Sequence, residues 1–422
     1  MLQNSLSTST AAGISSGTSS SASSNEPGSG TEIPILQLVV ASAGIATIKL
    51  DTVNQSYPIT INWGDGTTAA TASGNASHTY AASGSYDISM NSASAPLCLA
   101  TTAVVGDKQE FIGKIYNWNL LSLGLGAFNY SANLDTTEAS GAPVLVAGTA
   151  NIGKALFDHA ATSGVLDIRV PIPGITDLDS AFKSCGPLVA ILNSWDVSSV
   201  TSCYRAFYNL VAGSSVNINA WDTSSVTNMQ QMFWSTEGSS FGSLSEWNVS
   251  SVINMSEMFE GALLFNGNIS RWDVSSVTTF NRMFTDASAF NQDIGGWDVS
   301  SATSLRRMFG NAASLTQSVF NQDLSAWDLS SVTTVEGMFN SESTATYPHM
   351  SAANLEKTLY GWSLNAATPS TVDMADIVGS DAANIAEYTY ATGSNMDLAL
   401  NDATYGLVAA KGWTGVSNIT IA

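Results

Sequence analysis

Hydrophobic and polar residues recur with a nearly constant period through the middle of the chain. Six tryptophans mark this period, at spacings of 26, 26, 25, 25 and 30 residues: Trp195, Trp221, Trp247, Trp272, Trp297 and Trp327. Each opens nearly the same phrase, from WDVSSVT at 195 to WDLSSVT at 327. A fixed period in this range predicts one supersecondary unit that is copied and stacked. Stacked units display an extended surface more often than they build a catalytic pocket.

The spacing within one unit predicts a short strand followed by a short helix. Trp247 and Val249 alternate with polar residues, which is typical of a strand. Ser250 and Ser251 are candidate N-caps of the helix. The next apolar residues fall on one helical face, at i, i+3, i+6 and i+7: Val252, Met255, Met258 and Phe259. We count six clear units and two or three weaker ones upstream.

Residues 33–105 show a different pattern, in which apolar residues alternate in IATIKL, ITINW and YDISM between Gly-, Asn- and Ser-rich turns. This pattern predicts strands. The segments INWGDGTT (61–68) and HTYAASGSYDISM (78–90) resemble the signature of PKD-type immunoglobulin-like domains. The matching residues are Trp63, Gly64, Asp65, Gly66, Thr67, His78, Thr79, Tyr80, Gly84 and Tyr86. The resemblance implies a small β-sandwich in which His78 is structural.

The repeats carry a second resemblance. FNQDIGGWDVSSATSLRRMF (290–309) is similar to the BspA-type repeat, also called DUF285, a leucine-rich-repeat variant found on bacterial, protist and viral surface proteins. ANLEKTLYGW (353–362) and GLVAAKGWTGVSNITI (406–421) resemble the segment that closes such arrays. Thr223 and Asn248 depart from the family phrase, and the units after Trp297 and Trp327 carry insertions, which we expect to loop out from one face.

The expected architecture is an α+β repeat protein. It comprises a Ser/Thr/Gly-rich arm (1–32), a PKD-like β-sandwich (33–105), an LRR-like solenoid of about 25-residue strand–helix units (106–345) and a helical cap (346–422). In the cap, Ser351 precedes a helix that bears Leu355, Leu359 and Trp362. A second helix is expected over 403–411, ended by Gly412.

The composition of the chain restricts the classes of binding partner that are expected. The net charge of −21 comes from 34 acidic and 13 basic residues, and it disfavours nucleic acid and acidic membranes, whose phosphates need clustered Lys and Arg. The most apolar stretch, 33–50, is interrupted by Gln37, Ser42 and Lys49 and is not a membrane span. MLQNSLSTST at the start lacks the basic and apolar regions of a signal peptide.

Two side-chain ladders are candidate sites. The tryptophan row could stack sugars, but it keeps step with Val, Met and Phe at core spacing, so we expect it to be buried. The acids after the tryptophans could hold Ca²⁺: Asp196, Asp222, Asp273, Asp298 and Asp328. Asn248 interrupts that row and caps backbone amides as well as Asp does. We therefore expect capping at these positions, and likewise at Asp293 and Asp323.

Other chemistry-bearing residues form no recognisable constellation. His78, His159 and His349 have no metal-ligand spacing, and no nucleophile elbow, phosphate loop or dinucleotide motif is present. We therefore expect no catalytic, cofactor-binding or metal-ligating residues. Cys98, Cys185 and Cys203 cannot form a full disulfide framework; Cys185 and Cys203 either pair or are small buried residues. Acceptor motifs for N-glycosylation begin at Asn54, Asn75, Asn129, Asn248, Asn254, Asn268 and Asn418.

These observations predict a non-enzymatic structural and recognition protein. One hypothesis is a virion surface component, a fibre or capsid decoration, whose N-terminal arm contacts other structural proteins and whose repeats meet a host surface glycan or protein. The alternative is a bacterial or protist BspA-like adhesin at the cell surface. A polysaccharide-active enzyme is a minor alternative. Neither nucleic acid nor membrane insertion is expected, while a homo-oligomer is compatible with the sequence.

Overall fold

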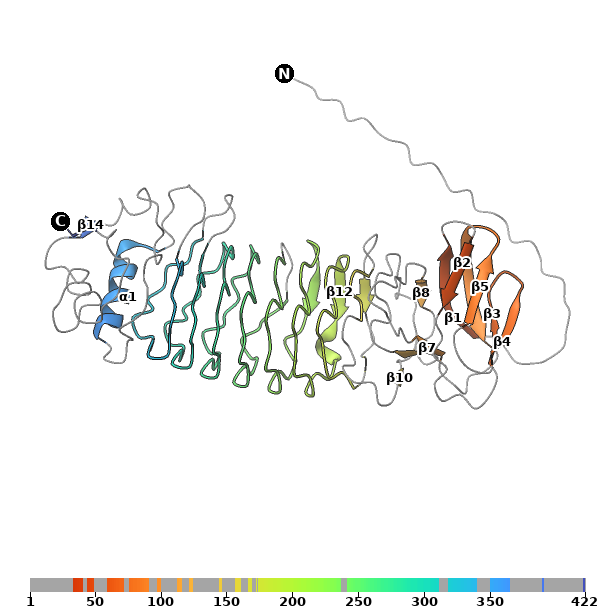
Figure 1. Cartoon of the computed structure of the whole chain (residues 1–422), viewed down its shortest axis with the longest axis horizontal. Coiled ribbons are helices and arrows are strands. Elements are labelled where there is room, and N and C mark those ends of the chain that lie inside the picture. Colours follow the sequence, from red (N-terminus) through yellow and green to blue (C-terminus); the bar gives the residue numbers. More distant parts are fainter. Residues whose placement is uncertain are drawn as a thin grey trace, which may run out of the picture. The chain divides into compact units, whose positions relative to one another are not determined.

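The structure is a computed structural model, and its elements are labelled in Figure 1. It describes residues 33–40, 44–48, 59–71, 76–90, 97–99, 112–115, 121–123, 144–145, 156–160, 166–168, 172, 174–236, 241–310, 318–339, 350–364, 389–390 and 420–421. The predicted arm at 1–32, residues 311–317 and 340–349 of the two longer units, and the helix expected at 403–411 lie outside these residues.

The first strands pair antiparallel in two sheets. The larger has the order β4 (Thr68–Thr71), β3 (Ile59–Asn62), β6 (Gly84–Met90), β1 (Ile33–Val40) and β8 (Ile112–Ile115). The smaller pairs β2 (Gly44–Ile48) with β5 (Ala76–Tyr80). Apolar residues alternate along these strands, so that Leu36, Ile61 and Ile88 are buried. The strands expected from the sequence between residues 33 and 90 are therefore present.

Pairing changes from antiparallel to parallel near the expected boundary at residue 105. β7 (Leu97–Leu99) pairs parallel with β9 (Leu121–Leu123), which pairs with β10 (Val144–Leu145). A second parallel sheet joins β11 (Leu166–Ile168), β12 (Leu188–Ile191) and β13 (Ser215–Asn217). Since β8 lies past residue 105 and pairs with β1, the two kinds of pairing overlap in sequence. A short 3₁₀ turn, η2 (Leu192–Ser194), follows β12, and β14 (Thr389–Tyr390) pairs with β15 (Thr420–Ile421).

Successive repeat units lie side by side and are joined by backbone hydrogen bonds (Figure 1). In the unit after Trp247, the N–H groups of Met255, Glu257 and Phe259 donate to carbonyls of the next unit at 2.7–3.2 Å. The N–H of Met258 instead closes a turn onto the carbonyl of Met255 at 3.3 Å. Parallel bridges link the same positions along the array: Ser202, Asn228, Asn254, Thr279, Ser304 and Thr334.

The strand and helix expected within each unit are replaced by turns. Residues 247–249 form no strand, and residues 255–260 form turns in which the third position has a left-handed backbone. That position has φ between 53° and 61° in seven units: Ser180, Arg205, Gln231, Glu257, Arg282, Arg307 and Gly337. A right-handed helix excludes such values. Ser250 and Ser251 therefore cap no helix.

The tryptophan row forms the core of the array, as the sequence predicts. All six indoles are at most 4% exposed. From Trp221 to Trp327, each indole Nε1 donates to a backbone carbonyl of the preceding unit at 2.8–3.1 Å. Phenylalanines from the turns stack in a second row, with ring centroids 5.2–5.8 Å apart: Phe182, Phe207, Phe233, Phe259, Phe284 and Phe309. The polar atoms of these five indoles are thus satisfied inside an apolar stack, whereas the buried Nε1 of Trp195 has no hydrogen-bond partner among the described residues.

Helix α1 (Ala352–Leu364) follows the last described unit and continues its contacts. Ser351 Oγ accepts a hydrogen bond from the N–H of Asn354 at 3.3 Å, which is the N-cap expected from the sequence. Leu355, Leu359 and Trp362 are buried. Trp362 Nε1 donates to the carbonyl of Leu324 at 2.9 Å, so the helix supplies one more member of the indole row.

Candidate recognition surface

The turns combine constant apolar positions with varying polar ones. The first, fourth and fifth positions are buried in every described unit, for example Met255, Met258 and Phe259. The second, third and sixth positions differ from unit to unit, and most are partly exposed. We call these positions the turn face: Asp179, Ser180, Lys183, Tyr204, Arg205, Tyr208, Gln230, Gln231, Trp234, Ser256, Glu257, Glu260, Asn281, Arg282, Thr285, Arg306, Arg307, Gly310, Glu336 and Gly337.

The backbone geometry explains why these side chains can vary. The N–H groups of the first, third and fifth positions bond to the next unit, and those of the fourth and sixth close the turn. The N–H of the second position is capped by a side chain two residues earlier, as Asn254 caps Ser256 at 2.9 Å. Most of these caps therefore come from residues outside the turn face. The third position needs a left-handed backbone, which the sequence fills with six residues other than glycine. Each costs about 1 kcal/mol relative to an ordinary conformation. The third position therefore carries side chains in six units, although glycine would adopt this backbone with less strain.

A polar chain runs along the third positions of three units. Arg205 Nε donates to Gln231 Oε1 at 2.5 Å, and Gln231 Nε2 donates to Glu257 Oε2 at 2.5 Å. The residues are 26 positions apart in each step, so the chain crosses two unit boundaries. It fixes the direction of the Arg205 side chain.

Aromatic rings stand beside this chain. Tyr208 and Trp234, at the sixth positions of neighbouring units, stack at 4.4 Å with an angle of 6° between the rings. The Arg205 guanidinium lies 4.8 Å from the ring centroid of Tyr204 and 5.1 Å from that of Tyr208. These are cation–π distances.

Ion pairs occupy the following units. Arg282 Nη1 lies 3.4 Å from Glu260 Oε1, and Arg306 makes two contacts of 3.1 Å with the Glu336 carboxylate. Burial and the nearby Glu257 carboxylate together raise the pKa of Glu260 to about 7, against the opposing effect of Arg282. No hydrogen-bond partner among the described residues reaches the buried Oε2 of Glu260.

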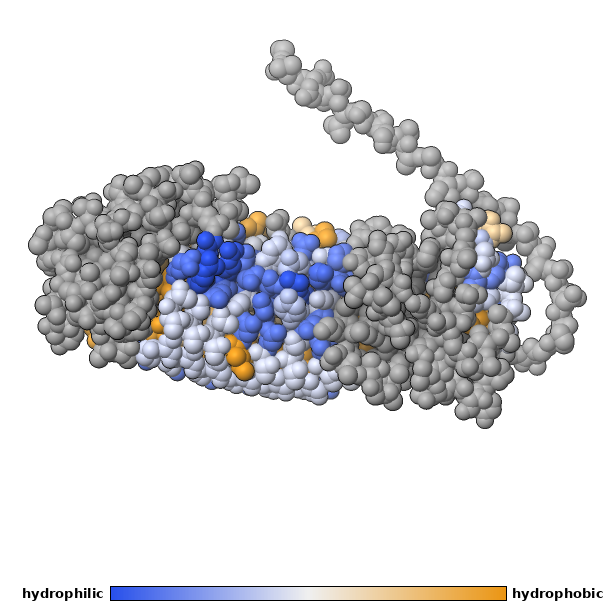
Figure 2. Space-filling view, in the orientation of Figure 1, coloured by the Kyte–Doolittle hydropathy of each residue, from blue (hydrophilic) through white to orange (hydrophobic). Residues whose placement is uncertain are grey.

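A second surface of the array is nearly invariant. We call it the aspartate edge: Asp196, Asp222, Asn248, Asp273, Asp298 and Asp328, with the serine two residues after each. Each side-chain oxygen accepts the N–H of that serine at 2.9–3.1 Å, which confirms the predicted capping. These hydrogen bonds lower the pKa of Asp196, Asp222 and Asp298. In the view of Figure 2, deeply hydrophilic residues gather over one part of the array, and its lower edge is pale.

Asparagines form a further ladder six residues before Trp272, Trp297 and Trp327. Asn266 Oδ1 accepts the N–H of Asn291, and Asn291 Oδ1 accepts the N–H of Asn321. In the cap, the N–H of Ser351 bonds to Asn321 Oδ1 in the same way. Asp293 and Asp323 cap the N–H groups of Gly295 and Ser325, as predicted. These polar groups are satisfied by the fold itself.

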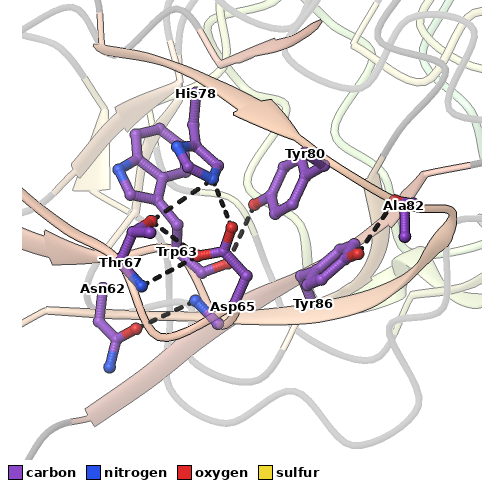
Figure 3. A network of polar contacts seen from close by, with 9 residues as sticks. Asn62, Trp63, Asp65, Thr67, His78, Tyr80, Ala82 and Tyr86 are labelled. Atoms are coloured by element: carbon purple, nitrogen blue, oxygen red, sulfur yellow. Dashed lines mark hydrogen bonds and ion pairs between the residues drawn. The ribbon is translucent and has the colours of Figure 1, made fainter. Parts of the chain in front are cut away.

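Figure 3 shows the polar network of the WGDGT turn. Asp65 Oδ1 accepts bonds from the N–H and hydroxyl of Thr67 at 3.0 and 2.6 Å, and its Oδ2 lies 2.7 Å from His78 Nε2. Burial opposes ionisation, but the hydrogen bonds from Thr67 and His78 outweigh it and lower the pKa of Asp65 to about 2. Tyr80 donates to the carbonyl of Trp63 at 3.0 Å. The network holds β5 to the β3–β4 turn, which is a structural role for His78.

The remaining candidates are separate from the turn face. His159 Nδ1 lies 2.6 Å from the carboxylate of Asp158. Cys185 and Cys203 are buried and unpaired, and burial raises the pKa of both thiols. Of the glycosylation motifs, those at Asn248, Asn254 and Asn268 lie in the array, where each asparagine caps a backbone N–H. His349 and the motifs at Asn54, Asn75, Asn129 and Asn418 fall outside the described residues.

Sequence reasoning missed the turn face because it assigned these positions to a helix. A comparison of the units position by position would have found it: Tyr204, Gln230, Ser256, Asn281 and Arg306 occupy one position with no common chemistry. The same comparison at the tryptophan position gives one residue type. Variation on a constant frame was therefore visible in the sequence.

The repeats match a known family model. Residues 170–241, 236–351 and 317–371 match the family described as Mycoplasma protein of unknown function, DUF285. This supports the resemblance of the array to BspA-like repeats. No significant match was found among curated proteins or among solved structures. Among the described residues, no helix is long and apolar enough to cross a membrane, and no three His, Cys, Asp or Glu side chains are grouped to hold a metal ion.

Proposed function

We propose that this chain is a non-enzymatic surface protein whose repeat array is a recognition surface. In this proposal the array is an LRR-like solenoid closed by a helical cap, and the PKD-like strands are an immunoglobulin-like sandwich. The observation that carries the proposal is the contrast within each turn, where apolar positions are constant and buried while the partly exposed positions vary. Repeat proteins commonly bind partners through variable side chains on a constant frame.

The location proposed is the outside of a particle, either a virion or a cell. The DUF285 match supports a surface protein, since BspA-like repeats are usual at cell surfaces. The net charge of −21 suits solubility and disfavours nucleic acid as the partner. Within this proposal, the virion version adds that residues 1–32 attach the chain to other structural proteins and that the array meets a host surface glycan or protein.

Antibodies against the array test the location. Intact particles from the source should be labelled by antibody raised to residues 174–339, and brief protease treatment should remove the label without lysing the particle. A fixed number of copies per purified virion supports the virion version, and labelling of cells alone supports the adhesin version. Signal that appears only after lysis contradicts surface display. Turnover of any polysaccharide by the pure chain contradicts the non-enzymatic assignment.

A further inference from the structure

One part of the turn face differs from the rest in chemistry. We call it the aromatic patch: Tyr204, Arg205, Tyr208 and Trp234. These four residues come from two neighbouring turns, and all are partly exposed. The patch gathers Tyr, Trp and Arg, the three residue types that dominate binding energy in protein interfaces. The other indoles of the array are buried in its core.

Contacts within the free protein hold the side chains of the aromatic patch in place before a partner binds. The stack of Tyr208 on Trp234 fixes both rings, and the Arg205 guanidinium is held by its bond to Gln231 and by the rings of Tyr204 and Tyr208. Ordering such side chains on binding normally costs about 0.5–1.5 kcal/mol each. Contacts already present in the free protein remove much of that cost.

The charge balance of Arg205 differs from that of two other turn-face arginines. Arg282 pairs with Glu260, and Arg306 pairs with Glu336. No carboxylate of the described residues lies within ion-pair distance of Arg205, whose Nε is bonded to the neutral amide of Gln231. In a chain with 34 acidic residues, the two terminal nitrogens of this partly buried arginine are unpaired with any carboxylate of the described residues. A guanidinium in this state is suited to bind a carboxylate in bidentate fashion.

We propose that the aromatic patch is a docking site for a protein partner that brings an Asp or Glu carboxylate to Arg205. This inference rests on the proposed function and names the face and the chemistry of its partner. The ring geometry favours protein over sugar. Tyr208 and Trp234 cover one face of each other, and the Arg205 guanidinium lies 5.1 Å from the Tyr208 ring centroid, so fewer ring faces are left on which a sugar could stack. Their edges, with the Arg205 charge between the tyrosines, match a mixed apolar and acidic protein surface.

A peptide-display library panned on the full chain provides the test. We expect the enriched peptides to share an acidic residue next to apolar ones, and to lose binding when that acid is changed to its amide. Arg205→Gln and Trp234→Ala should each weaken a selected synthetic peptide by about tenfold or more. The matched control is Arg306→Gln, which removes a turn-face arginine paired with Glu336 and should leave peptide affinity unchanged. Thermal unfolding of each variant checks that the fold is retained.

The alternatives give distinct results. Peptides without an acid, equal binding by Arg205→Gln, or no enriched peptide would each overturn the docking site. Binding to uronic or sialic acid glycans on an array, lost in Arg205→Gln and accompanied by no peptide binding, would assign the patch to an acidic sugar instead. These outcomes leave surface display standing, because antibody labelling of intact particles measures that separately. Absence of labelling would contradict the proposed function even if peptides bind.

Discussion

The turn face and the aspartate edge are two surfaces of the same units, and they differ in what their side chains do. On the aspartate edge, side chains complete the backbone hydrogen bonding: Asp298 accepts the N–H of Ser300, and Asn248 accepts that of Ser250. On the turn face, most backbone groups bond to each other or to capping side chains outside the face, such as Asn254, so few turn-face side chains serve that purpose. Asp179, which accepts the N–H of Tyr204 at 3.0 Å, is an exception. A surface whose side chains satisfy the backbone stays constant, and one whose side chains mostly lack that task can vary.

The prediction with the largest expected effect compares a tryptophan of the core with a tryptophan of the turn face. Trp272 is buried and donates to the carbonyl of Leu244, whereas Trp234 is partly exposed on the turn face. We expect Trp272→Ala to lower the free energy of unfolding by about 3–5 kcal/mol. Trp234→Ala should cost about 1 kcal/mol or less, because only part of its area is removed from water. Urea unfolding measures both, and equal costs would show that the turn face is part of the core.

Glu260 lies on the turn face and has a raised pKa, so it predicts a pH dependence of stability. Burial raises its pKa from 4.5 to about 7, with Glu257 and Asp286 adding to the shift and Arg282 opposing it. The folded state therefore binds this proton more tightly than the unfolded chain does. The contribution of Glu260 to stability should be greatest below pH about 4.5, fall by at most about 3 kcal/mol as the pH rises to about 7, and then level off.

Glu260→Gln should remove this part of the pH dependence, because an amide does not titrate. Glu246→Gln is the matched control, since Glu246 is exposed. The unfolding midpoint measured between pH 5 and 8 reports the effect. A slope that is the same in Glu260→Gln and in the unaltered chain would exclude Glu260 as its source.

The aspartate edge should respond to loss of a single acceptor. Asp298→Ala removes the oxygen that binds the N–H of Ser300 at 3.0 Å, and we expect a loss of about 1 kcal/mol. Asp298→Asn keeps an acceptor and should cost less, as Asn248 does the same task in its own unit. Since hydrogen bonds from Ser300 lower the pKa of Asp298, its contribution is present above pH about 4 and lost as the pH falls further. Acid unfolding curves of the three proteins separate these cases.

Much of this arrangement was predictable because burial leaves a strong periodic signal. The tryptophan row, the capping by Asp298 and its equivalents, and the helix with Leu355, Leu359 and Trp362 are confirmed. The caps depend on contacts between residues two positions apart, and the tryptophan row and the helix depend on the regular spacing of large apolar residues. The sequence therefore predicts the core and its caps.

The turns were not predictable by the same means. Val252, Met255 and Met258 are three residues apart, a spacing that fits a helix and also fits successive turns closed by bonds between residues i and i+3. Glycine at the third turn position would have distinguished the two, but only Gly337 supplies it. Residues other than glycine, such as Arg205 and Glu257, give no sign of a left-handed backbone, so the apolar spacing alone assigns these positions to a helix. The arginine without a carboxylate partner is a property of the three-dimensional structure alone.

The prediction with the smallest expected effect tests whether the backbone conformation decides which substitutions the turn face tolerates. Ser180 has φ of 58° at the third position, and its N–H bonds to the carbonyl of Tyr204 at 2.8 Å. Ser180→Gly relieves about 1 kcal/mol of backbone strain and adds a similar entropy cost of folding, so stability should change by less than about 0.5 kcal/mol. Ser180→Val places a β-branched residue in the left-handed region and should cost about 1–2 kcal/mol. If valine were tolerated as well as glycine in urea unfolding, the constraint on this surface would lie in its side chains, and the contrast with the aspartate edge would be lost.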